Sequence, residues 1–429
     1  MEFDLKFDYV KEDKRFKLDQ YREIVKKYDK MLVDGTGLGH EFLGWMHYAS
    51  SISQDFIDAI NKKAKYFRDN FDTFVICGIG GSYLGSRAVI EAINGIYSQD
   101  KMKIIYLGQT LDSNYTAQVI DYLKTRNFCV CVISKSGTTT ETSIAFRILK
   151  EILENKLGKE KAKDAIVAVT DKEKGALRTL ADREGYTTFE LPENIGGRYS
   201  VISAVGLFPI AVAGINIQEF INGFIEGEKM FGSDDIDKNP AYQYACQKNT
   251  LYKLGYKVEF AVTYEPRLAM LNEWAKQLFD ESNGKEDKGL LIMSSVFTTD
   301  LHSIGQFIQE GSKILFETVL TFKNPNKDIE IPFDKEDLDG LNYIAGKNLS
   351  FVCEKAHQGT TIAHAFNGNV PNISLQIDKL TPETLGAYMY FSMKACAMGG
   401  YLLGINPFNQ PGVEVYKRNM FHLLGKKGY

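Results

Sequence analysis

Apolar runs of strand length alternate with helix-length patterns along most of this chain. In the first half, continuous apolar runs predict four buried strands, at residues 73–77, 103–107, 128–133 and 164–169. Helical patterns lie between them, at residues 86–93 and 141–153. Buried strands joined by crossover helices are typical of a parallel sheet that is covered on both faces. The pattern therefore predicts one doubly wound α/β unit.

A second series of the same kind follows and predicts a second α/β unit. Its expected strands are residues 257–264, 289–293, 313–320 and 372–377, and its expected helices lie near residues 267–281, 339–366 and 382–404. Between the units, residues 196–214 are rich in glycine and small apolar residues, and form either a crossover helix or part of the second core.

The remaining segments are charged or rich in turn residues. The first 60 or so residues are charged and predict a helical segment. Residues 234–240 and 324–334 collect charged residues, proline, glycine and asparagine, and predict surface connections.

The composition is that of a soluble globular protein of two or three domains. The chain has 429 residues, of which 44% are hydrophobic and 25% charged, and its net charge is −4. Such a balance offers no large basic surface for nucleic acid or for an anionic membrane. The longest apolar stretch, residues 204–215, is well short of the ~20 residues that span a bilayer. The N-terminus is charged from its second residue and does not resemble a signal peptide.

The cysteines give no indication of a metal site. All six are scattered, without a Cys-x-x-Cys pair or the spacing of a zinc site. We expect reduced thiols in the core of a cytosolic protein.

A glycine-rich turn, residues 78–86, follows the first buried strand and leads into a helix. It departs from the dinucleotide fingerprint in two ways. Tyr83 stands where the third glycine belongs, and the end of the next strand carries Gln109 rather than an acid that could bind a ribose. The Gly-Lys-Ser/Thr ending of a nucleotide P-loop is also missing. The turn indicates either an anion site at a helix N-terminus or close strand-to-helix packing.

A richer segment, residues 134–142, follows the third strand. It supplies six hydroxyl groups, one lysine and the amides of a helix N-terminus. Parallel sheets bind ligands at the carboxyl ends of their strands, where this segment lies. A helix cap would use only one or two of these hydroxyls. The segment therefore predicts a site for a monophosphate.

Five motifs, at residues 78–82, 134–142, 196–200, 281–285 and 409–417, occur in one order along the chain. Together they resemble the glucose-6-phosphate isomerase (phosphoglucose isomerase) family in its short bacterial-type form. The resemblance implies an α/β fold of two doubly wound, mainly parallel-sheet sugar-isomerase domains with flanking helices. It also implies a cytoplasmic homodimer without metal or cofactor. The implied reaction interconverts glucose 6-phosphate and fructose 6-phosphate through a cis-enediol(ate), in glycolysis and gluconeogenesis.

The resemblance divides the chain into four parts. Residues 1–65 form an N-terminal helical segment that packs on the larger domain. Residues 66–200 form the first sugar-isomerase domain with the phosphate loops, and residues 201–405 form the second. Residues 406–429 form a C-terminal helix that carries Lys417.

Catalytic roles follow from the same resemblance. Glu281 matches the base that moves a proton between C2 and C1 of the opened sugar, and Arg198 matches the cation that stabilises the charge formed on the sugar oxygens. His302 and Lys417 match the groups that assist ring opening. The context of His302 departs from that of longer family members. In the family this histidine comes from the neighbouring subunit.

The substrate contacts carried over from the family fall into two groups. Gln277 lies four residues before Glu281 on the same helix face, and a sugar hydroxyl is its expected partner. Gly197 allows the backbone to approach the ligand closely, and Gln410 matches a further ligand contact. The expected phosphate contacts are Ser82, Ser134, Lys135, Ser136, Thr139 and Thr142.

Three other functions compete with this interpretation. An isomerase of the same fold could act on mannose 6-phosphate, since one or two residues at C2 decide this preference. A sugar-phosphate sensor would need the phosphate loops but not all four catalytic residues. A metal-dependent isomerase is disfavoured because the six histidines do not cluster at ligand spacings.

Overall fold

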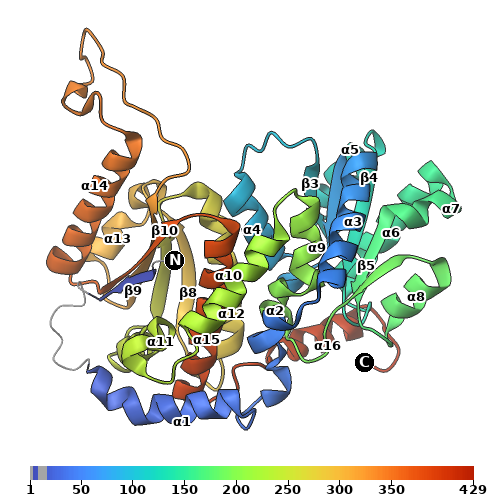
Figure 1. Cartoon of the computed structure of the whole chain (residues 1–429), viewed down its shortest axis with the longest axis horizontal. Helices are drawn as coiled ribbons and strands as arrows, with labels where there is room; N and C mark the ends of the chain where they lie inside the picture. Colours follow the sequence, from blue (N-terminus) through green and yellow to red (C-terminus); the bar gives the residue numbers. More distant parts are fainter. Residues whose placement is uncertain (1–2, 8–16) are drawn as a thin grey trace.

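The structure of the chain, a computed structural model, describes residues 3–7 and 17–429. Two five-stranded sheets stand next to one another, each flanked by helices (Figure 1). One sheet is wholly parallel and the other is parallel except at one edge strand. This architecture confirms the predicted α/β class.

The first sheet has the strand order β3-β2-β4-β5-β6. Its strands are β2 (Thr73–Cys77), β3 (Lys103–Leu107), β4 (Phe128–Ile133), β5 (Ile166–Thr170) and β6 (Thr187–Glu190). Cys77 at the end of β2 is in register with Leu107 of β3 and Val132 of β4. The turns after these three strands therefore begin side by side at one edge of the sheet. The predicted strand at 164–169 begins at Ile166 because a short 3-10 turn precedes it.

Residues 196–214, which were expected to form either a crossover helix or part of the second core, belong to the helices around the first sheet. These residues form η6 (Gly197–Ile202) and α9 (Ala204–Val212), and every residue of α9 is buried. Phe208 of α9 packs edge-to-face on Phe74 of β2, so this stretch covers the first sheet. The other helices here are α3 (Gln54–Asn70), α4 (Leu84–Asn94), α5 (Ser113–Lys124), α6 (Thr140–Leu157), α7 (Lys159–Ala162) and α8 (Ala176–Glu184).

The second sheet has the strand order β1-β10-β9-β7-β8. Its strands are β1 (Phe3–Lys6), β7 (Val258–Thr263), β8 (Leu291–Val296), β9 (Leu315–Asn324) and β10 (Asn372–Lys379). The helical prediction for the N-terminal segment is wrong at residues 3–6, which pair antiparallel with β10. Phe3 alternates with polar neighbours, and its ring packs against Phe231 and Phe391, so a strand buries it best. Residues 1–2 and 8–16 lie outside the described part of that segment.

Helix α12 (Ala269–Asn283) joins the two halves of the molecule. It packs against β8 and α15 (Pro382–Leu403) of the second half and against α4 of the first. The apolar stripe predicted for it is buried at Leu271, Trp274 and Leu278. The other helices of this half are α1 (Arg22–Val33), α10 (Ile217–Met230), α11 (Pro240–Lys253), α13 (Gly305–Glu310) and α14 (Leu349–Ile362), and α2 (Tyr48–Ser51) packs against α10. The C-terminal helix α16 (Val413–Leu423) lies beneath the first half in Figure 1.

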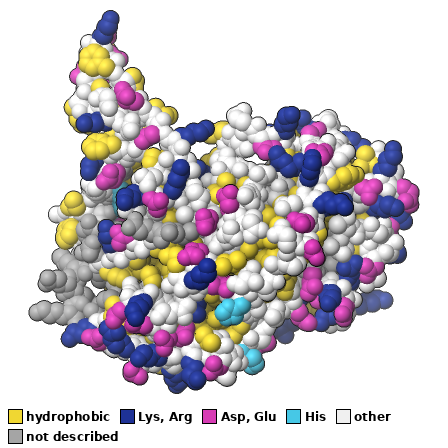
Figure 2. Space-filling model, viewed as in Figure 1, with side chains coloured by type: hydrophobic (Ala, Val, Ile, Leu, Met, Phe, Trp, Pro, Cys, Tyr) yellow, Lys and Arg dark blue, Asp and Glu magenta, His cyan; other side chains and the backbone are white. Residues whose placement is uncertain are grey.

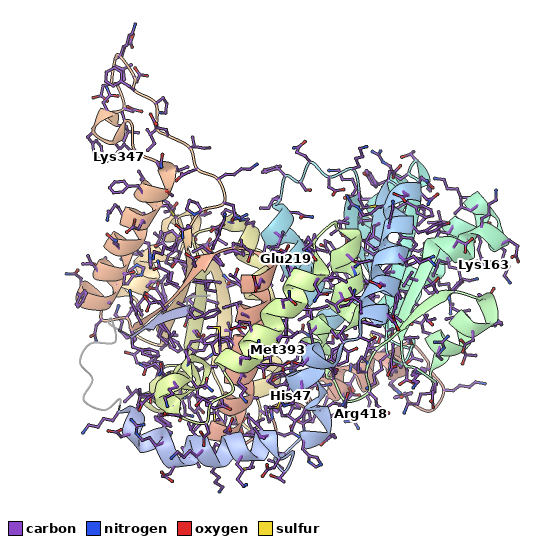
Figure 3. The ribbon with its side chains drawn as sticks, in the orientation of Figure 1. His47, Lys163, Glu219, Lys347, Met393 and Arg418 are labelled. Carbon is purple, nitrogen blue, oxygen red and sulfur yellow. The ribbon has the colours of Figure 1, made fainter. Side chains whose placement is uncertain are left out.

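A projecting arm, residues 325–348, replaces the first part of the predicted helix at 339–366. The helix α14 begins only at Leu349. Gly340 and Gly346 have positive φ angles of 66° and 75°, a left-handed backbone that a regular helix does not contain. The arm extends away from both sheets above α14 (Figure 1), and Lys347 marks its base in Figure 3.

The expectations about thiols, charge and membrane spans can be compared with the described residues. All six cysteines are free thiols, and five are buried. On the face in Figure 2, acidic and basic side chains are interspersed. Within residues 3–7 and 17–429, no helix is long and apolar enough to cross a membrane.

Candidate active site

The glycine turn after β2 brings the two halves of the molecule into close contact. A Cβ atom on Gly81 would lie 2.1 Å from the carbonyl oxygen of Gly197, so only glycine fits there. A Cβ atom on Gly80 would lie 3.0 Å from Nε2 of Gln277. Ser82 ends this turn, within the short helix η4 (Gly80–Ser82). The turn therefore places β2 of the first sheet next to Gly197 and to α12.

The hydroxyl-rich segment forms the turn between β4 and α6. Ser134 is buried, and its hydroxyl accepts a hydrogen bond from the Gly137 amide at 3.0 Å. Thr139 is the N-cap of α6, and its side chain makes no capping bond. The buried hydroxyl of Thr142 has no hydrogen-bond partner among the described residues. Unused hydroxyls and the free amides of a helix N-terminus are what a phosphate group binds.

Two other members of this segment are engaged with the protein. Lys135 donates to the Glu193 carbonyl at 2.9 Å. Ser136 accepts from the Thr138 amide at 3.2 Å. The segment also contacts the end of β2, since the Cys77 thiol lies 3.6 Å from the Thr142 carbonyl oxygen.

Arg198 of η6 is buried, with 3% of its surface exposed, and its guanidinium joins three segments of the chain. Nε donates to the Ser282 hydroxyl at 2.6 Å, and Nη1 donates to Oε1 of Gln410 at 3.1 Å. Nη2 donates to the Pro407 carbonyl at 2.9 Å. Nη1 also lies 3.3 Å from Oε1 of Glu281. The cation is thus fixed beside one carboxylate.

Glu281 lies on the last turn of α12, with 26% of its side chain exposed. Its other oxygen, Oε2, accepts a hydrogen bond from Nε2 of Gln277 at 2.9 Å, as the four-residue spacing on one helix face predicts. Both residues line a cavity of about 530 Å³, together with Tyr83, Lys285 and Gln410. The cavity lies where η4, α12 and the segment before α16 meet.

Neither Lys417 nor His302 lines this cavity. Lys417 lies on α16, marked by Arg418 in Figure 3. Its pKa is raised first by its hydrogen bond to Glu414, with a small contribution from the charge of Glu281. His302 ends η9 (Thr299–His302), is exposed and does not line the cavity. Within this chain, therefore, Glu281, Arg198, Gln277 and Gln410 come together, whereas neither Lys417 nor His302 lines the cavity beside them.

The sequence model of the phosphoglucose isomerase family matches residues 26–426 of this chain. The chain belongs to the phosphoglucose isomerase family. It is 50% identical to the glucose-6-phosphate isomerase of Staphylococcus haemolyticus over 414 aligned residues. The alignment covers 96% of this chain and 93% of that protein. It is 51% identical over 414 residues to that of Staphylococcus saprophyticus, with the same coverage of both chains.

Two solved structures share the fold of this phosphoglucose isomerase-family chain. A hypothetical protein from Thermus thermophilus has a TM-score of 0.90 and 26% identity, covering 99% of this chain and 100% of its own. A glucose-6-phosphate isomerase from Chlamydia trachomatis has a TM-score of 0.78 and 22% identity. The superposition covers 95% of this chain and 84% of that one. The second likeness concerns the fold alone.

Several residues of this phosphoglucose isomerase-family site were not assigned a role from the sequence. Ser282 and Lys285 lie within the motif of residues 281–285, and Asp280 directly precedes it. Lys285 and Asp280 both line the cavity, and Ser282 holds Arg198. Their position in or next to the motif was the only signal, since their contacts depend on how distant segments pack.

Asp280 introduces a pH-dependent contribution to stability next to Glu281. Burial raises the pKa of this carboxyl to about 6, although the Ile292 amide donates to it and Lys248 lies near. A raised pKa means that the folded chain holds this proton more tightly than the unfolded chain. The resulting stability is complete below the unfolded pKa near 4 and is lost as the pH rises through 6.

We predict that Asp280→Asn raises the thermal unfolding midpoint at pH 7.5. The substitution removes a partly buried negative charge that destabilises the fold by roughly 1–3 kcal/mol, and it keeps an acceptor for the Ile292 amide. The gain should shrink as the pH falls towards 4, where the wild-type carboxyl is neutral. Thermal unfolding at both pH values measures it. A gain independent of pH would show that ionisation of Asp280 is not its source.

Proposed function

We propose that this chain interconverts glucose 6-phosphate and fructose 6-phosphate. Membership of the phosphoglucose isomerase family over residues 26–426 supports this function. The observation that carries it is the 3.3 Å contact between the buried Arg198 guanidinium and Glu281, whose carboxylate lines the cavity. A carboxylate that can take a proton, beside a cation that can stabilise an oxyanion, is what aldose–ketose isomerisation requires.

The phosphate of the substrate would bind at the turns after β2 and β4. Ser82, Thr139 and Thr142 offer hydroxyls there, and the N-terminus of α6 offers amides and the positive end of its dipole. Ser134, Lys135 and Ser136 belong to the same turn. Binding energy from this unreacting end orients the sugar over Glu281.

Proton transfer would then use Glu281 in both directions. Its carboxylate removes the proton from C2 of the opened aldose, and the C–H electron pair forms the C1–C2 double bond of a cis-enediolate. Arg198 stabilises the negative charge on the sugar oxygens. The hydroxyl proton of C2 passes to O1, Glu281 returns its proton to C1, and the C2 carbonyl of the ketose forms. Gln277 orients Glu281 through their hydrogen bond, and Gln410 holds Arg198. A Cβ atom on Gly197 would meet no heavy atom within 4 Å, so the backbone beside Arg198 is open to a ligand.

Ring opening needs a proton donor and acceptor at the ring oxygen and the C1 hydroxyl. We assign this step to Lys417 of the same chain and His302 of a second copy. The exposed position of His302 outside the cavity of its own chain supports this assignment. The arm also exposes large apolar side chains, at 70% for Phe333, 88% for Leu338 and 78% for Tyr343, which a partner subunit could cover. The proposed active form is therefore a homodimer.

The proposed place of action is glycolysis and gluconeogenesis in the cytoplasm. Six free cysteines, none in a disulfide, suit a reducing compartment. No metal or cofactor is part of the proposed mechanism.

A coupled assay tests the function. Purified protein is given fructose 6-phosphate, and glucose 6-phosphate is detected with and without EDTA. We expect isomerisation at the same rate in both, because carboxylate and guanidinium supply the chemistry. Absence of product would reject the proposed function, and activity lost to EDTA and restored by a divalent cation would reject the metal-free mechanism.

The phosphate site makes a separate prediction. Thr139→Ala should raise KM for fructose 6-phosphate by roughly tenfold, because a hydrogen bond to a charged group contributes about 1.5–3 kcal/mol. The value of kcat should change much less, since Thr139 does not contact the reacting carbons. Steady-state kinetics measure both. Thr125→Ala, at the end of α5, is the control, because this hydroxyl donates to the Tyr122 carbonyl of its own helix. A fall in kcat at constant KM would place Thr139 outside the phosphate site.

A further inference from the structure

Lys285 occupies a position that the proposed mechanism does not use. It lies just beyond the end of α12 and lines the same cavity as Glu281. Its ammonium group donates to two backbone carbonyls, that of Ser282 at 2.8 Å and that of Asn406 at 2.5 Å. The first acceptor belongs to α12, and the second lies in the segment that follows α15. One half-buried cation thus joins two segments that are distant in sequence.

The Asn406 carbonyl begins the loop that holds Arg198. Three of the acceptors around the guanidinium come from this loop: the Pro407 carbonyl at 2.9 Å, the Asn409 carbonyl at 3.3 Å and the Gln410 side chain at 3.1 Å. The fourth hydrogen-bond acceptor is the Ser282 hydroxyl, and the carbonyl of that same serine binds Lys285. Arg198 and Lys285 therefore hold the same two segments together from two sides.

Electrostatics favour a cation at this point. The last carbonyls of a helix carry the negative end of its dipole, and Lys285 binds one of them in the last turn of α12. Hydrogen bonds from an ammonium group to carbonyls are stronger than those from a neutral donor. A neutral side chain in its place would leave the Asn406 carbonyl without this partner.

We propose that the ammonium of Lys285 is a positioning group that fixes residues 406–410 against the end of α12 and thereby sets where Arg198 and Gln410 stand relative to Glu281. This inference rests on the proposed isomerase function. A displacement of about 1 Å in a catalytic group can reduce a rate by about a hundredfold, so an anchor at this distance from the chemistry affects turnover.

The charge of Lys285 is sensitive to pH in the working range. Burial first, and then the nearby Arg198, lower the pKa of its ammonium to about 8. Cys396 of α15, Glu281 of α12 and Glu286 of the following turn oppose this change. The ammonium is therefore charged at pH 7 and loses its proton as the pH rises through 8. The anchor weakens in the same range.

Three variants test the proposal: Lys285→Met, Lys285→Arg and, as a matched control, Lys288→Met. Lys288 is a neighbouring lysine whose ammonium pairs with Glu286 at 3.2 Å. Steady-state kinetics from pH 6.5 to 9.5 and the thermal unfolding midpoint are measured for each. We expect Lys285→Met to lower kcat by roughly tenfold to a hundredfold with a smaller change in KM. Lys288→Met should match the wild type.

The pH profile separates positioning from a general contribution to stability. The wild type should lose activity above pH 8. Lys285→Arg should recover most of the activity at pH 7 and keep it above pH 8, because guanidinium stays charged there. This profile decides the matter even if Lys285→Met does not fold.

Two results would overturn the role of Lys285 alone: wild-type kcat in Lys285→Met, or the same alkaline decline in Lys285→Arg as in the wild type. A wild-type chain without isomerase activity would instead overturn the proposed function, and this inference with it.

Discussion

Glu281→Gln is expected to lower kcat by roughly 10²–10⁴-fold, because the amide cannot take the proton from C2. KM should change little, since the substitution leaves the phosphate turns untouched and glutamine can still accept the hydrogen bond from Gln277. Arg198 keeps its other acceptors, so the buried cation retains hydrogen bonds. Steady-state kinetics and the unfolding midpoint measure these effects.

Glu273→Gln is the matched control for that experiment. Glu273 lies on the same helix and lines the same cavity, but it contacts Ser294 and Lys276 rather than Arg198. Its variant should keep kcat near the wild-type value. Equal losses in the two variants would mean that any carboxylate of the cavity matters, and the role assigned to Glu281 would be wrong.

A heterodimer of two inactive variants is the second large expected effect. One subunit carries Glu281→Gln and the other His302→Ala, and two different affinity tags allow the mixed dimer to be isolated. If each site takes Glu281 from one subunit and His302 from the other, one of the two sites is intact. The mixed dimer should then have about half of the wild-type activity, whereas each homodimer is nearly inactive.

Lys417→Ala provides the matched control for the heterodimer. The charge of Glu281 in the same chain contributes to the raised pKa of Lys417, and we assign both residues to the same subunit's site. A mixed dimer of Glu281→Gln and Lys417→Ala therefore has no intact site and should stay inactive. An inactive dimer of Glu281→Gln with His302→Ala, or a monomeric active enzyme, would contradict a shared site.

The sequence predicts the buried strands well because both faces of a parallel sheet are covered. Residues 73–77 and 128–133 are apolar runs, and they form the fully buried strands β2 and β4. Residues 103–107 form β3 as predicted, but the prediction of burial is wrong there, because β3 is an edge strand with an exposed Lys103 and three half-buried residues. The edge strand β1 was missed because it has four residues, and their partner, β10, lies some 370 positions later in the chain. A pattern within the segment itself cannot show this pairing. The arm was missed because residues 339–348 have a helical pattern but also contain turn-forming residues. These make local hydrogen bonds in place of a helix, such as that from the Asn342 side chain to the Asp334 carbonyl.

The candidate site was predicted in its members but not in its contacts. Motif order pointed to Glu281 and Arg198, and the structure brings them together. The sequence could not show that Arg198 is nearly inaccessible and held by backbone carbonyls, because these carbonyls belong to a loop more than 200 residues away. Nor could it show the raised pKa of Asp280 or the double anchor of Lys285, which depend on burial. The division into domains at residues 65, 200 and 405 stays a prediction.

The measurement that tests the central claim most directly is isomerisation in D₂O. A proton carried by Glu281 exchanges with solvent while it is on the carboxylate, whereas a hydride shift between the carbons would not exchange. After many turnovers, the wild type should give sugar phosphate with deuterium bound to C1 or C2, and Glu281→Gln should give none in the same time. Product without carbon-bound deuterium, or equal labelling by both proteins, would contradict the account.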